Sequence, residues 1–327
     1  MLKTVFTLGP SSSDEDIIIR LLNTADRFRL NTSHMNEKTL GNFLLNLSKI
    51  FDRTGKAIPV VIDLQGSKMR IGKYPSVNSI PEKFSLINSA TSNSIHEIPV
   101  PHNQFFDSLK INDLIFLNDA KIVIKIINAQ KNRAEAITVT NGPLSSNKGI
   151  NRQKHPVLFK ELTEKDQKMI LISNKYDFTE FAFSFTHDGS EADKIRLHTN
   201  HKIIAKIERP EALDNLKSID ANFDEIWLCR GDLGAQAGIF KLGKLQEFFI
   251  SQIKTLSKDC YLAGQVLEHM TYFKEPTRSE IVHLYDIGKA GFKGFVLSDE
   301  TAVGKNPCNV AKFLDEYKSA GDKKKSN

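Results

Sequence analysis

The chain has 327 residues, of which 40% are hydrophobic and 26% charged, values that are ordinary for a globular protein and argue against extensive disorder. No apolar run approaches the length of about 18 residues that suggests a membrane-spanning helix, and the N-terminus lacks the features of a signal peptide. The net charge is +6 and no nucleic-acid-binding module is recognisable, so we expect neither nucleic acid nor a membrane as a partner. Cys229, Cys260 and Cys308 have no metal-binding spacing and predict reduced thiols in the cytoplasm.

The first 72 residues predict strands that alternate with helices. Strands are expected at residues 4–8, 27–33 and 58–63, and helices at about 17–22 and 37–51. We expect Ser12 or Ser13 to cap the first helix and Gly55 to end the second. If residues 27–33 are extended throughout, Arg29, Asn31 and Ser33 face the same way, because side chains alternate along a strand.

Between residues 73 and 155 the pattern changes. Short alternating runs such as 114–117 and 122–126 are separated by Asn, Asp and Gly, which is typical of antiparallel β structure with turns. We therefore predict a small β-rich lid domain at 73–155, inserted between a first barrel part at 1–72 and a second at 156–327.

The alternation of strands and helices resumes after the insertion. Strands are expected at 178–184, 202–208, 225–229, 260–263 and 294–297, and helices at 163–172, near Glu191, at 212–219, 239–257, 278–288 and 308–317. Eight buried strands that alternate with helices predict an α/β fold, a (β/α)8 TIM barrel with an inserted small β-rich lid domain.

Charged residues gather where the predicted strands end. Lys206 and Glu208 close an otherwise apolar strand and are two residues apart, so their side chains should point the same way. Barrel enzymes place their catalytic groups at the carboxyl ends of strands. The alternative is a strand end whose charges are paired only for solubility.

Oxygen-bearing residues predict two cation sites at this end of the barrel. The carboxylates of Glu208 and Asp232, with no nearby Cys or His in the sequence, favour Mg²⁺ or Mn²⁺. Asn31, Ser33 and Asp63 form a second oxygen group that suits a monovalent cation or simple hydrogen bonding. Turn chemistry is the other interpretation of this second group.

Basic residues supply the charge that phosphoryl transfer requires. Arg29, Arg70 and Lys206 concentrate positive charge near the predicted carboxylates, and such transfer depends mainly on positioning and charge stabilisation. The sequence contains neither a P-loop nor a Gly-x-Gly-x-x-Gly motif, which disfavours those two kinds of nucleotide site.

Nine stretches, in order along nearly the whole chain, resemble the pyruvate kinase family. They are Thr7 to Ser12, Arg29 to His34, Asp63 to Arg70, Lys148 to Asn151, Leu162 to Asp166, Lys206 to Glu208, Arg230 to Gly234, Pro276 to Arg278 and Ser298 to Ala302. The resemblance implies transfer of phosphate from phosphoenolpyruvate to ADP, giving pyruvate and ATP, in a cytoplasmic glycolytic enzyme. By position, it implies catalytic roles for Lys206, Arg29 and Arg70, Mg²⁺ binding by Glu208 and Asp232, K⁺ binding by Asn31, Ser33, Asp63 and the Leu64 carbonyl, nucleotide binding by His34 and Lys148, and a substrate pocket containing Gly231, Gly264 and Ser184.

The chain also departs from the family pattern. Gly264 stands where the family has a threonine beside the substrate carboxylate, so a hydroxyl that takes part in binding and proton relay is absent. Residues 283–286 lack the usual dimer-forming pattern, and we expect the C-terminal regulatory domain of the family to be missing, which puts the usual tetramer in doubt. Two alternatives therefore stay open: an enzyme on this scaffold with a changed substrate or acceptor, and a non-catalytic binding relative.

Overall fold

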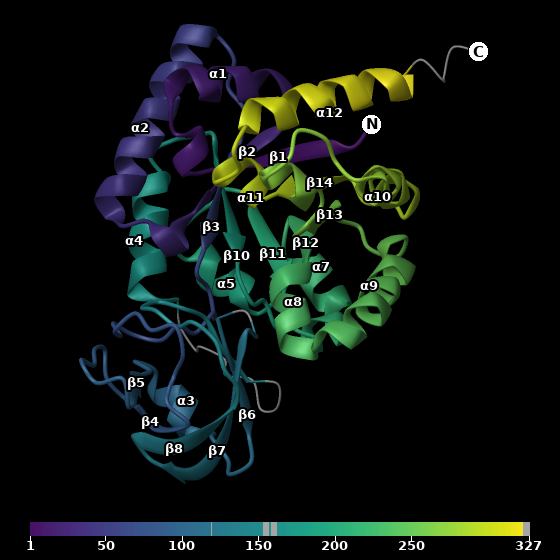
Figure 1. The fold of residues 1–327 in the computed structure, drawn as a ribbon. Coiled ribbons are helices and arrows are strands. Elements are labelled where there is room, and N and C mark those ends of the chain that lie inside the picture. The colour runs from purple at the N-terminus through teal and green to yellow at the C-terminus, as the bar shows by residue number, and fades with distance from the viewer. Residues whose placement is uncertain (119, 153–156, 158–161, 323–327) are drawn as a thin grey trace. The chain divides into compact units, whose positions relative to one another are not determined.

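The computed structural model describes residues 1–118, 120–152, 157 and 162–322 (Figure 1). The chain divides into two compact units: the first comprises Met1–Gly66, Leu162–Gly231 and Gly243–Asn327, and the second comprises Ser67–Glu161 and Asp232–Leu242. The domain boundaries expected at 72/73 and 155/156 stay predictions, and residues 155 and 156 lie outside the described part of the chain.

The first unit contains a closed barrel of eight parallel strands in the order β1-β14-β13-β12-β11-β10-β3-β2. The strands are β1 (Lys3–Leu8), β2 (Arg27–Asn31), β3 (Val60–Leu64), β10 (Thr179–Phe183), β11 (Ile203–Ile207), β12 (Glu225–Cys229), β13 (Cys260–Ala263) and β14 (Gly294–Leu297). Strands β3, β11 and β12 are buried along their whole length, as expected for a parallel sheet that helices cover. The predicted (β/α)8 barrel is confirmed.

An apolar cluster fills the barrel interior. Val61, Ile204, Trp227 and Val296 belong to this cluster and come from four different strands. On β11, Ile204 lies between Lys202 and Lys206, and all three point inward because alternate residues share a face. The apolar cluster therefore separates charged residues at the amino ends of the strands from those at the carboxyl ends.

Helices follow the strands and complete the fold of the first unit. They are α1 (Glu15–Thr24), α2 (Glu37–Thr54), α4 (Glu164–Ser173), α5 (Glu191–Arg196), α6 (Glu211–Asp214), α7 (Leu216–Asn222), α9 (Ile239–Ile253), α10 (Arg278–Lys289), α11 (Asp299–Ala302) and α12 (Pro307–Asp322), with 3₁₀ turns η1 (Pro10–Ser12), η2 (Thr32–His34) and η3 (Glu268–Thr271). Helix α8 (Arg230–Ala237) begins in the first unit, directly after β12, whereas the rest of α8 and the start of α9, up to Leu242, belong to the second unit. The last helix, α12, packs on α1 and so completes the ring of helices (Figure 1).

Three local predictions were wrong. The cap of α1 is Asp14, whose carboxylate accepts from the backbone N–H groups of Asp16 and Ile17, whereas Ser12 lies in η1 and accepts from Gly9 N–H. The extended segment stops at Asn31, because the Asn31 side chain accepts from the Ser33 N–H and turns the chain into η2. The helix expected at 212–219 is divided into α6 and α7.

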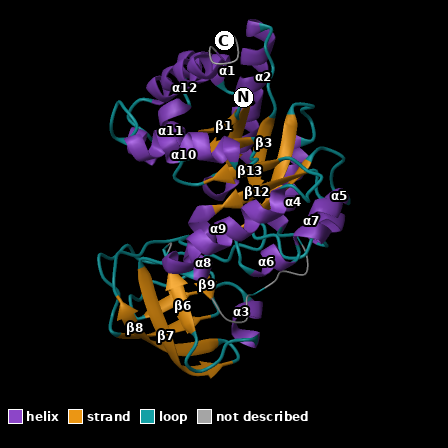
Figure 2. Cartoon of the chain, turned by 90° about the vertical axis from the view of Figure 1, so that its right-hand side faces the viewer, coloured by secondary structure: helices purple, strands orange, loops and turns teal. Residues whose placement is uncertain are grey.

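The second unit contains a six-stranded sheet in the order β5-β4-β8-β7-β6-β9. Its elements are β4 (Lys83–Ile87), β5 (Glu97–Pro99), α3 (Asn103–Asp107), β6 (Leu114–Leu117), β7 (Ile122–Gln130), β8 (Arg133–Thr140) and β9 (Ile150–Arg152) (Figure 2). All its strand pairs are antiparallel, as predicted, except that β4 and β5 are parallel. The sheet has its own apolar core, which includes Leu86, Phe105, Ile124 and Ala136.

In the described part of the chain, no helix combines the length and the apolar character that crossing a membrane requires.

Candidate active site

The ammonium group of Lys206 is the centre of a buried charged cluster at the carboxyl end of β11. Its Nζ lies 2.9 and 3.1 Å from the two carboxylate oxygens of Asp63 and 2.8 Å from Ser184 Oγ. A further carboxylate oxygen, Oε1 of Glu208, is 3.0 Å away, which confirms that Lys206 and Glu208 point the same way. Only 7% of Lys206 is exposed, so these contacts are shielded from solvent.

The charges in this cluster maintain one another. Burial alone would lower the pKa of Lys206, but the carboxylates of Asp63 and Glu208 raise it well above its ordinary value. Burial alone would raise the pKa of Asp63, but Lys206 and Arg29 hold it below its ordinary value. Lys206 is therefore a cation and Asp63 an anion throughout the neutral pH range.

Arg29 enters the cluster from β2. Its Nε and Nη2 donate to Asp63 Oδ2 at 2.8 and 2.5 Å, and its Nη1 donates to Thr7 Oγ1 at 2.8 Å. Thr7 was not among the predicted site residues. The sequence could have indicated it, since Thr7 lies near the end of β1 and two residues after Val5, which faces the barrel interior.

The oxygen group predicted for a monovalent cation is assembled from the ends of β2 and β3. Asn31 and Asp63 are register partners, and the Leu64 carbonyl accepts from Ser184 Oγ at 2.8 Å. The Asn31 side chain accepts from the Ser33 N–H at 3.1 Å, which supports the turn interpretation of Asn31 and Ser33, while the cation interpretation stays a prediction.

The carboxylate of Glu208 is oriented by a backbone amide. Its Oε2 accepts from the Phe185 N–H at 2.8 Å, and only 2% of Glu208 is exposed. One oxygen thus faces Lys206 and the other faces an amide, which holds the carboxylate plane.

Two glycines of the predicted substrate pocket lie side by side. A Cβ built on Gly264 would be 3.3 Å from the backbone nitrogen of Gly231. The guanidinium of Arg230 donates to the carbonyls of Gly264 and Gln265, from Nε at 2.9 Å and from Nη2 at 2.8 Å respectively. Arg230 therefore fixes the turn after β13, a contact that the sequence does not reveal.

The second unit contains the other predicted charged residues, Asp232, Arg70 and Lys148. Asp232 accepts from Lys68 Nζ at 2.7 and 2.8 Å through its two oxygens, and the Lys68 side chain also lies beside Gly149. The backbones of Arg70 and Gly149 form an isolated antiparallel β-bridge, while Lys148 is exposed. Lys68 was not a predicted site residue, although it lies within the Asp63 to Arg70 stretch that carries the family resemblance.

His34 lies in η2, and its side chain is outside the described part of the structure.

Comparison with known proteins decides the family. Residues 1–311 match the family described as "Pyruvate kinase, barrel domain". The chain belongs to the pyruvate kinase family.

Individual pyruvate kinases resemble the chain over most of its length. It is 29% identical to a pyruvate kinase of Aeropyrum pernix over 98% of this chain and 71% of that protein. It is 31% identical to one of Buchnera aphidicola subsp. Schizaphis graminum over 93% of this chain and 66% of that protein. The crystal structure of pyruvate kinase from Pyrobaculum aerophilum matches with a TM-score of 0.84 and 26% identity, covering 97% of this chain and 72% of that one.

The backbone at Gly264 has a conformation that a threonine would not adopt readily. Gly264 has φ of +93°, a conformation that residues with a side chain rarely adopt. Its missing Cβ would point at the backbone nitrogens of Gly231 and Arg230, 3.3 and 3.6 Å away. The absent hydroxyl thus accompanies a local backbone conformation that suits glycine.

The metal ligands expected from the pyruvate kinase family are few. Among the residues that the structure describes, no three His, Cys, Asp or Glu side chains are grouped as a metal site. Mg²⁺ commonly uses one or two protein carboxylates together with substrate oxygens, so two carboxylates are a sufficient protein contribution.

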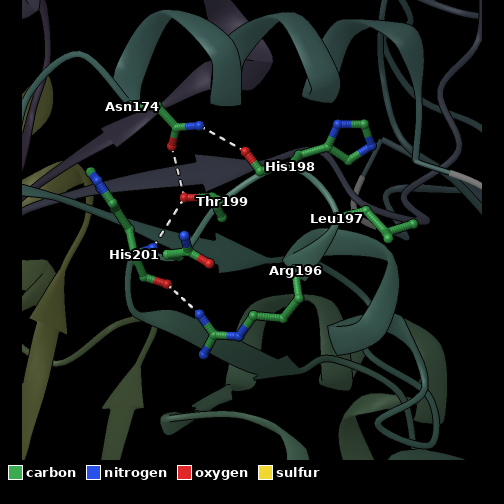
Figure 3. Close-up of a pocket in the computed structure, with 7 residues that line it drawn as sticks. Asn174, Arg196, Leu197, His198, Thr199 and His201 are labelled. Atoms are coloured by element: carbon green, nitrogen blue, oxygen red, sulfur yellow. Dashed lines mark hydrogen bonds between the residues drawn. The ribbon is translucent and has the colours of Figure 1, made fainter.

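A separate pocket lies before β11 and is lined by residues 174 and 196–201 (Figure 3). Asn174 donates to the His198 carbonyl at 2.7 Å and accepts from Thr199 Oγ1 at 2.7 Å, and Arg196 donates to the His201 carbonyl at 2.6 Å. These bonds hold the turn that leads into the strand carrying Lys206.

Proposed function

We propose that the chain transfers a phosphoryl group from phosphoenolpyruvate to ADP, giving pyruvate and ATP. The observation that carries this proposal is the buried ammonium of Lys206, which lies within 3.1 Å of oxygens from Asp63, Ser184 and Glu208. Membership of the pyruvate kinase family supports it, because Lys206 occupies a stretch that matches the family.

The chemistry of Lys206 follows from its surroundings. Its raised pKa keeps the positive charge, and burial excludes the water that would screen it. Preorganised positive charge of this kind stabilises the oxygens of a phosphoryl group during transfer. We assign to Arg29 and Arg70 the binding of phosphate oxygens.

We propose that Glu208 and Asp232 hold Mg²⁺, with Mn²⁺ as a substitute. The donor set fits, since both residues offer carboxylate oxygens, and the nearby thiol of Cys229 is not a competing ligand because burial raises its pKa well above the ordinary value. Bound Mg²⁺ would neutralise charge on phosphate oxygens. Asp232 already accepts a hydrogen bond from the Lys68 ammonium. A metal ion bound to Asp232 would therefore either displace that ammonium or share the carboxylate with it.

The oxygen group of Asn31, Ser33, Asp63 and the Leu64 carbonyl is proposed to bind K⁺. The fit lies in the donors: all are oxygens, and the carbonyl of Leu64, which accepts from Ser184, has a second lone pair. The charge of a bound K⁺ would add to the positive charges of Arg29 and Lys206 near the transferred phosphoryl group.

The remaining predicted roles complete the proposal. His34 and Lys148 are assigned to the nucleotide, and Gly231, Gly264 and Ser184 to the substrate pocket. We propose phosphoenolpyruvate, pyruvate, ADP and ATP as partners, with neither nucleic acid nor membrane. A cytoplasmic glycolytic role fits the family and the free thiols of Cys229, Cys260 and Cys308.

Gly264 favours one second candidate, an enzyme of this scaffold with a different substrate or acceptor. The threonine hydroxyl that the family resemblance leads us to expect is missing, and the positive φ of Gly264 disfavours any residue with a side chain at this position. A substrate or acceptor that does not depend on that hydroxyl would suit this position.

The test is pyruvate release by the purified full chain supplied with phosphoenolpyruvate, ADP, Mg²⁺ and K⁺, with Lys206→Met as the control. We expect turnover that falls by about 10³-fold in the variant, because a preorganised charge is lost. Absence of wild-type turnover, with Mg²⁺-dependent binding of phosphoenolpyruvate intact, would reject ADP as the acceptor and favour the second candidate.

A further inference from the structure

Arg209 directly follows Glu208, and its guanidinium is buried in an unusual way. Arg209 is 3% exposed, and among the described residues its Nε and Nη1 are buried without a hydrogen-bond partner. Burial lowers its pKa, while the carboxylates of Glu211, Glu191 and Glu208 act in the opposite direction. A buried group of this kind is costly, so its retention calls for an explanation.

The guanidinium of Arg209 lies over an aromatic ring. Cζ of Arg209 lies 5.2 Å from the centre of the Phe185 ring, and Phe185 is 2% exposed. A guanidinium over an aromatic face is attracted to it, and the attraction is stronger when both are removed from water.

Phe185 has a strained backbone. Its φ is +60°, in the left-handed region that residues other than glycine rarely occupy. Such strain persists only when surrounding contacts impose it, and it is concentrated at functional sites. The buried ring and the guanidinium over it are contacts that can impose this conformation.

The strained residue acts directly on the proposed metal ligand. In this conformation, the Phe185 N–H donates to Glu208 Oε2 at 2.8 Å. An extended Phe185 would point this amide elsewhere, because the direction of an N–H follows the backbone dihedrals. Arg209 and Glu208 are neighbours in sequence, so one chain segment supplies both the carboxylate and the cation.

We propose that Arg209 is a positioning residue: by stacking on Phe185 it holds the strained backbone whose N–H orients Glu208 for the divalent cation. This inference rests on the proposed role of Glu208 in metal binding. Hydrogen-bond partners behind metal ligands tune affinity, and their loss typically weakens metal binding by about 10- to 100-fold.

The experiment measures Mn²⁺ binding to the full chain by electron paramagnetic resonance, with and without phosphoenolpyruvate, and needs no turnover. Arg209→Met, which keeps an apolar stem but removes the charge, should weaken Mn²⁺ binding about tenfold. Arg209→Lys, which keeps a cation over the ring, should restore most of the affinity. Thermal unfolding of each variant is measured alongside.

A matched pair at Phe185 isolates the backbone. Phe185→Ala and Phe185→Gly both remove the ring, but glycine adopts positive φ without strain. The alanine variant should therefore lose about tenfold in Mn²⁺ affinity, and the glycine variant clearly less. Adding Arg209→Met to Phe185→Gly should cause little further loss, because the residue that Arg209 restrains no longer needs restraint.

Glu208→Gln separates this inference from the proposed function. If Glu208→Gln weakens Mn²⁺ binding and Arg209→Met does not, the positioning role is wrong while the metal role of Glu208 stands. If Arg209→Met only lowers the unfolding temperature, Arg209 is structural and the inference also fails. If Glu208→Gln leaves Mn²⁺ binding unchanged, the metal assignment fails and takes the inference with it. Should Arg209→Met not fold, Phe185→Ala against Phe185→Gly still decides the backbone role.

Discussion

The two ends of the barrel each hold a carboxylate between an arginine of β2 and a lysine at β11. At the carboxyl ends of the strands, Asp63 is bound by Arg29 and Lys206. At the amino ends, Glu225 is bound by Arg27 and Lys202 at 2.6 Å each. The same two strands thus build two charged clusters, which the apolar interior separates.

The clusters differ in the groups that surround the central charge. Glu225 is fully buried, and Trp227 Nε1 adds a bond of 2.6 Å to one of its oxygens. A second carboxylate, Glu180, lies 3.4 Å from Arg27 in the same cluster. The carboxyl-end cluster likewise contains a second carboxylate, Glu208, and in addition a hydroxyl, Ser184, around one ammonium. We expect a phosphoryl oxygen to replace one of the several oxygen contacts of Lys206, whereas we expect the cluster at Glu225 to serve stability.

The largest effect is expected from Asp63→Ala, which breaks the carboxyl-end cluster. It leaves Arg29 and Lys206 buried without their main anion, and such losses cost about 3–5 kcal/mol of unfolding free energy. Turnover per folded molecule should also fall by at least about 10²-fold, because Lys206 is no longer held. Denaturant unfolding and pyruvate release measure the two effects. A variant that loses stability but keeps full turnover would remove Asp63 from the site.

Glu225→Gln tests the amino-end cluster. Removing this charge takes away the carboxylate that Arg27 and Lys202 both contact at 2.6 Å, while Glu180 stays 3.4 Å from Arg27. The loss should cost about 3 kcal/mol of unfolding free energy. Turnover per folded molecule should stay within about twofold of wild type, since the apolar interior separates this cluster from Lys206. A turnover loss comparable with that of Asp63→Ala would contradict the division between the two ends.

Gly264→Thr examines whether the missing hydroxyl can be restored at the carboxyl end. The positive φ and the close backbone nitrogen of Gly231 predict a loss of about 1–3 kcal/mol in unfolding free energy. Because the Cβ would point at that nitrogen, we expect turnover no higher than wild type. Faster pyruvate release by the variant would show that the backbone rearranges and that the hydroxyl alone was lacking.

Glu180→Gln should have the smallest effect and sharpens the contrast in pH dependence. Burial raises the pKa of Glu180 above its ordinary 4.5, although the charges of Arg27 and Lys202 act to lower it. The folded state therefore holds this proton more tightly than the unfolded state, and the unfolding free energy falls as pH rises from about 4.5 toward the folded pKa. Asp63 has a lowered pKa and contributes stability that is lost as pH falls below its ordinary 3.8. The variant should reduce the first slope, to which the raised pKa values of Asp166, Glu268 and Glu300 also contribute, and keep the second, with a change below about 1 kcal/mol at pH 7. Unfolding free energies between pH 3 and 7 check this, and an unchanged slope above pH 4.5 would refute it.

Strand periodicity predicted much of the fold and part of the site. Buried apolar runs located all eight barrel strands, and alternation placed Lys206 and Glu208 on one face. Alternation failed at Ser33 because an Asn31 side-chain bond ends the strand.

Contacts that depend on loop conformation could not be predicted. The stacking of Arg209 on Phe185 requires a positive φ at a phenylalanine, which no local pattern signals. The bonds of Arg230 to the turn at Gly264 depend likewise on the path of a loop far along the chain.

The most direct test of the division between the two ends compares Lys206→Met with Lys202→Met. Both lysines pair with buried carboxylates, four residues apart on the same face of one chain segment. Pyruvate release from phosphoenolpyruvate and ADP is measured per folded molecule, with unfolding free energy as the second readout. We predict that both variants lose stability but only Lys206→Met loses turnover, by about 10³-fold. Equal turnover in the two variants would contradict the assignment of Lys206 to phosphoryl transfer.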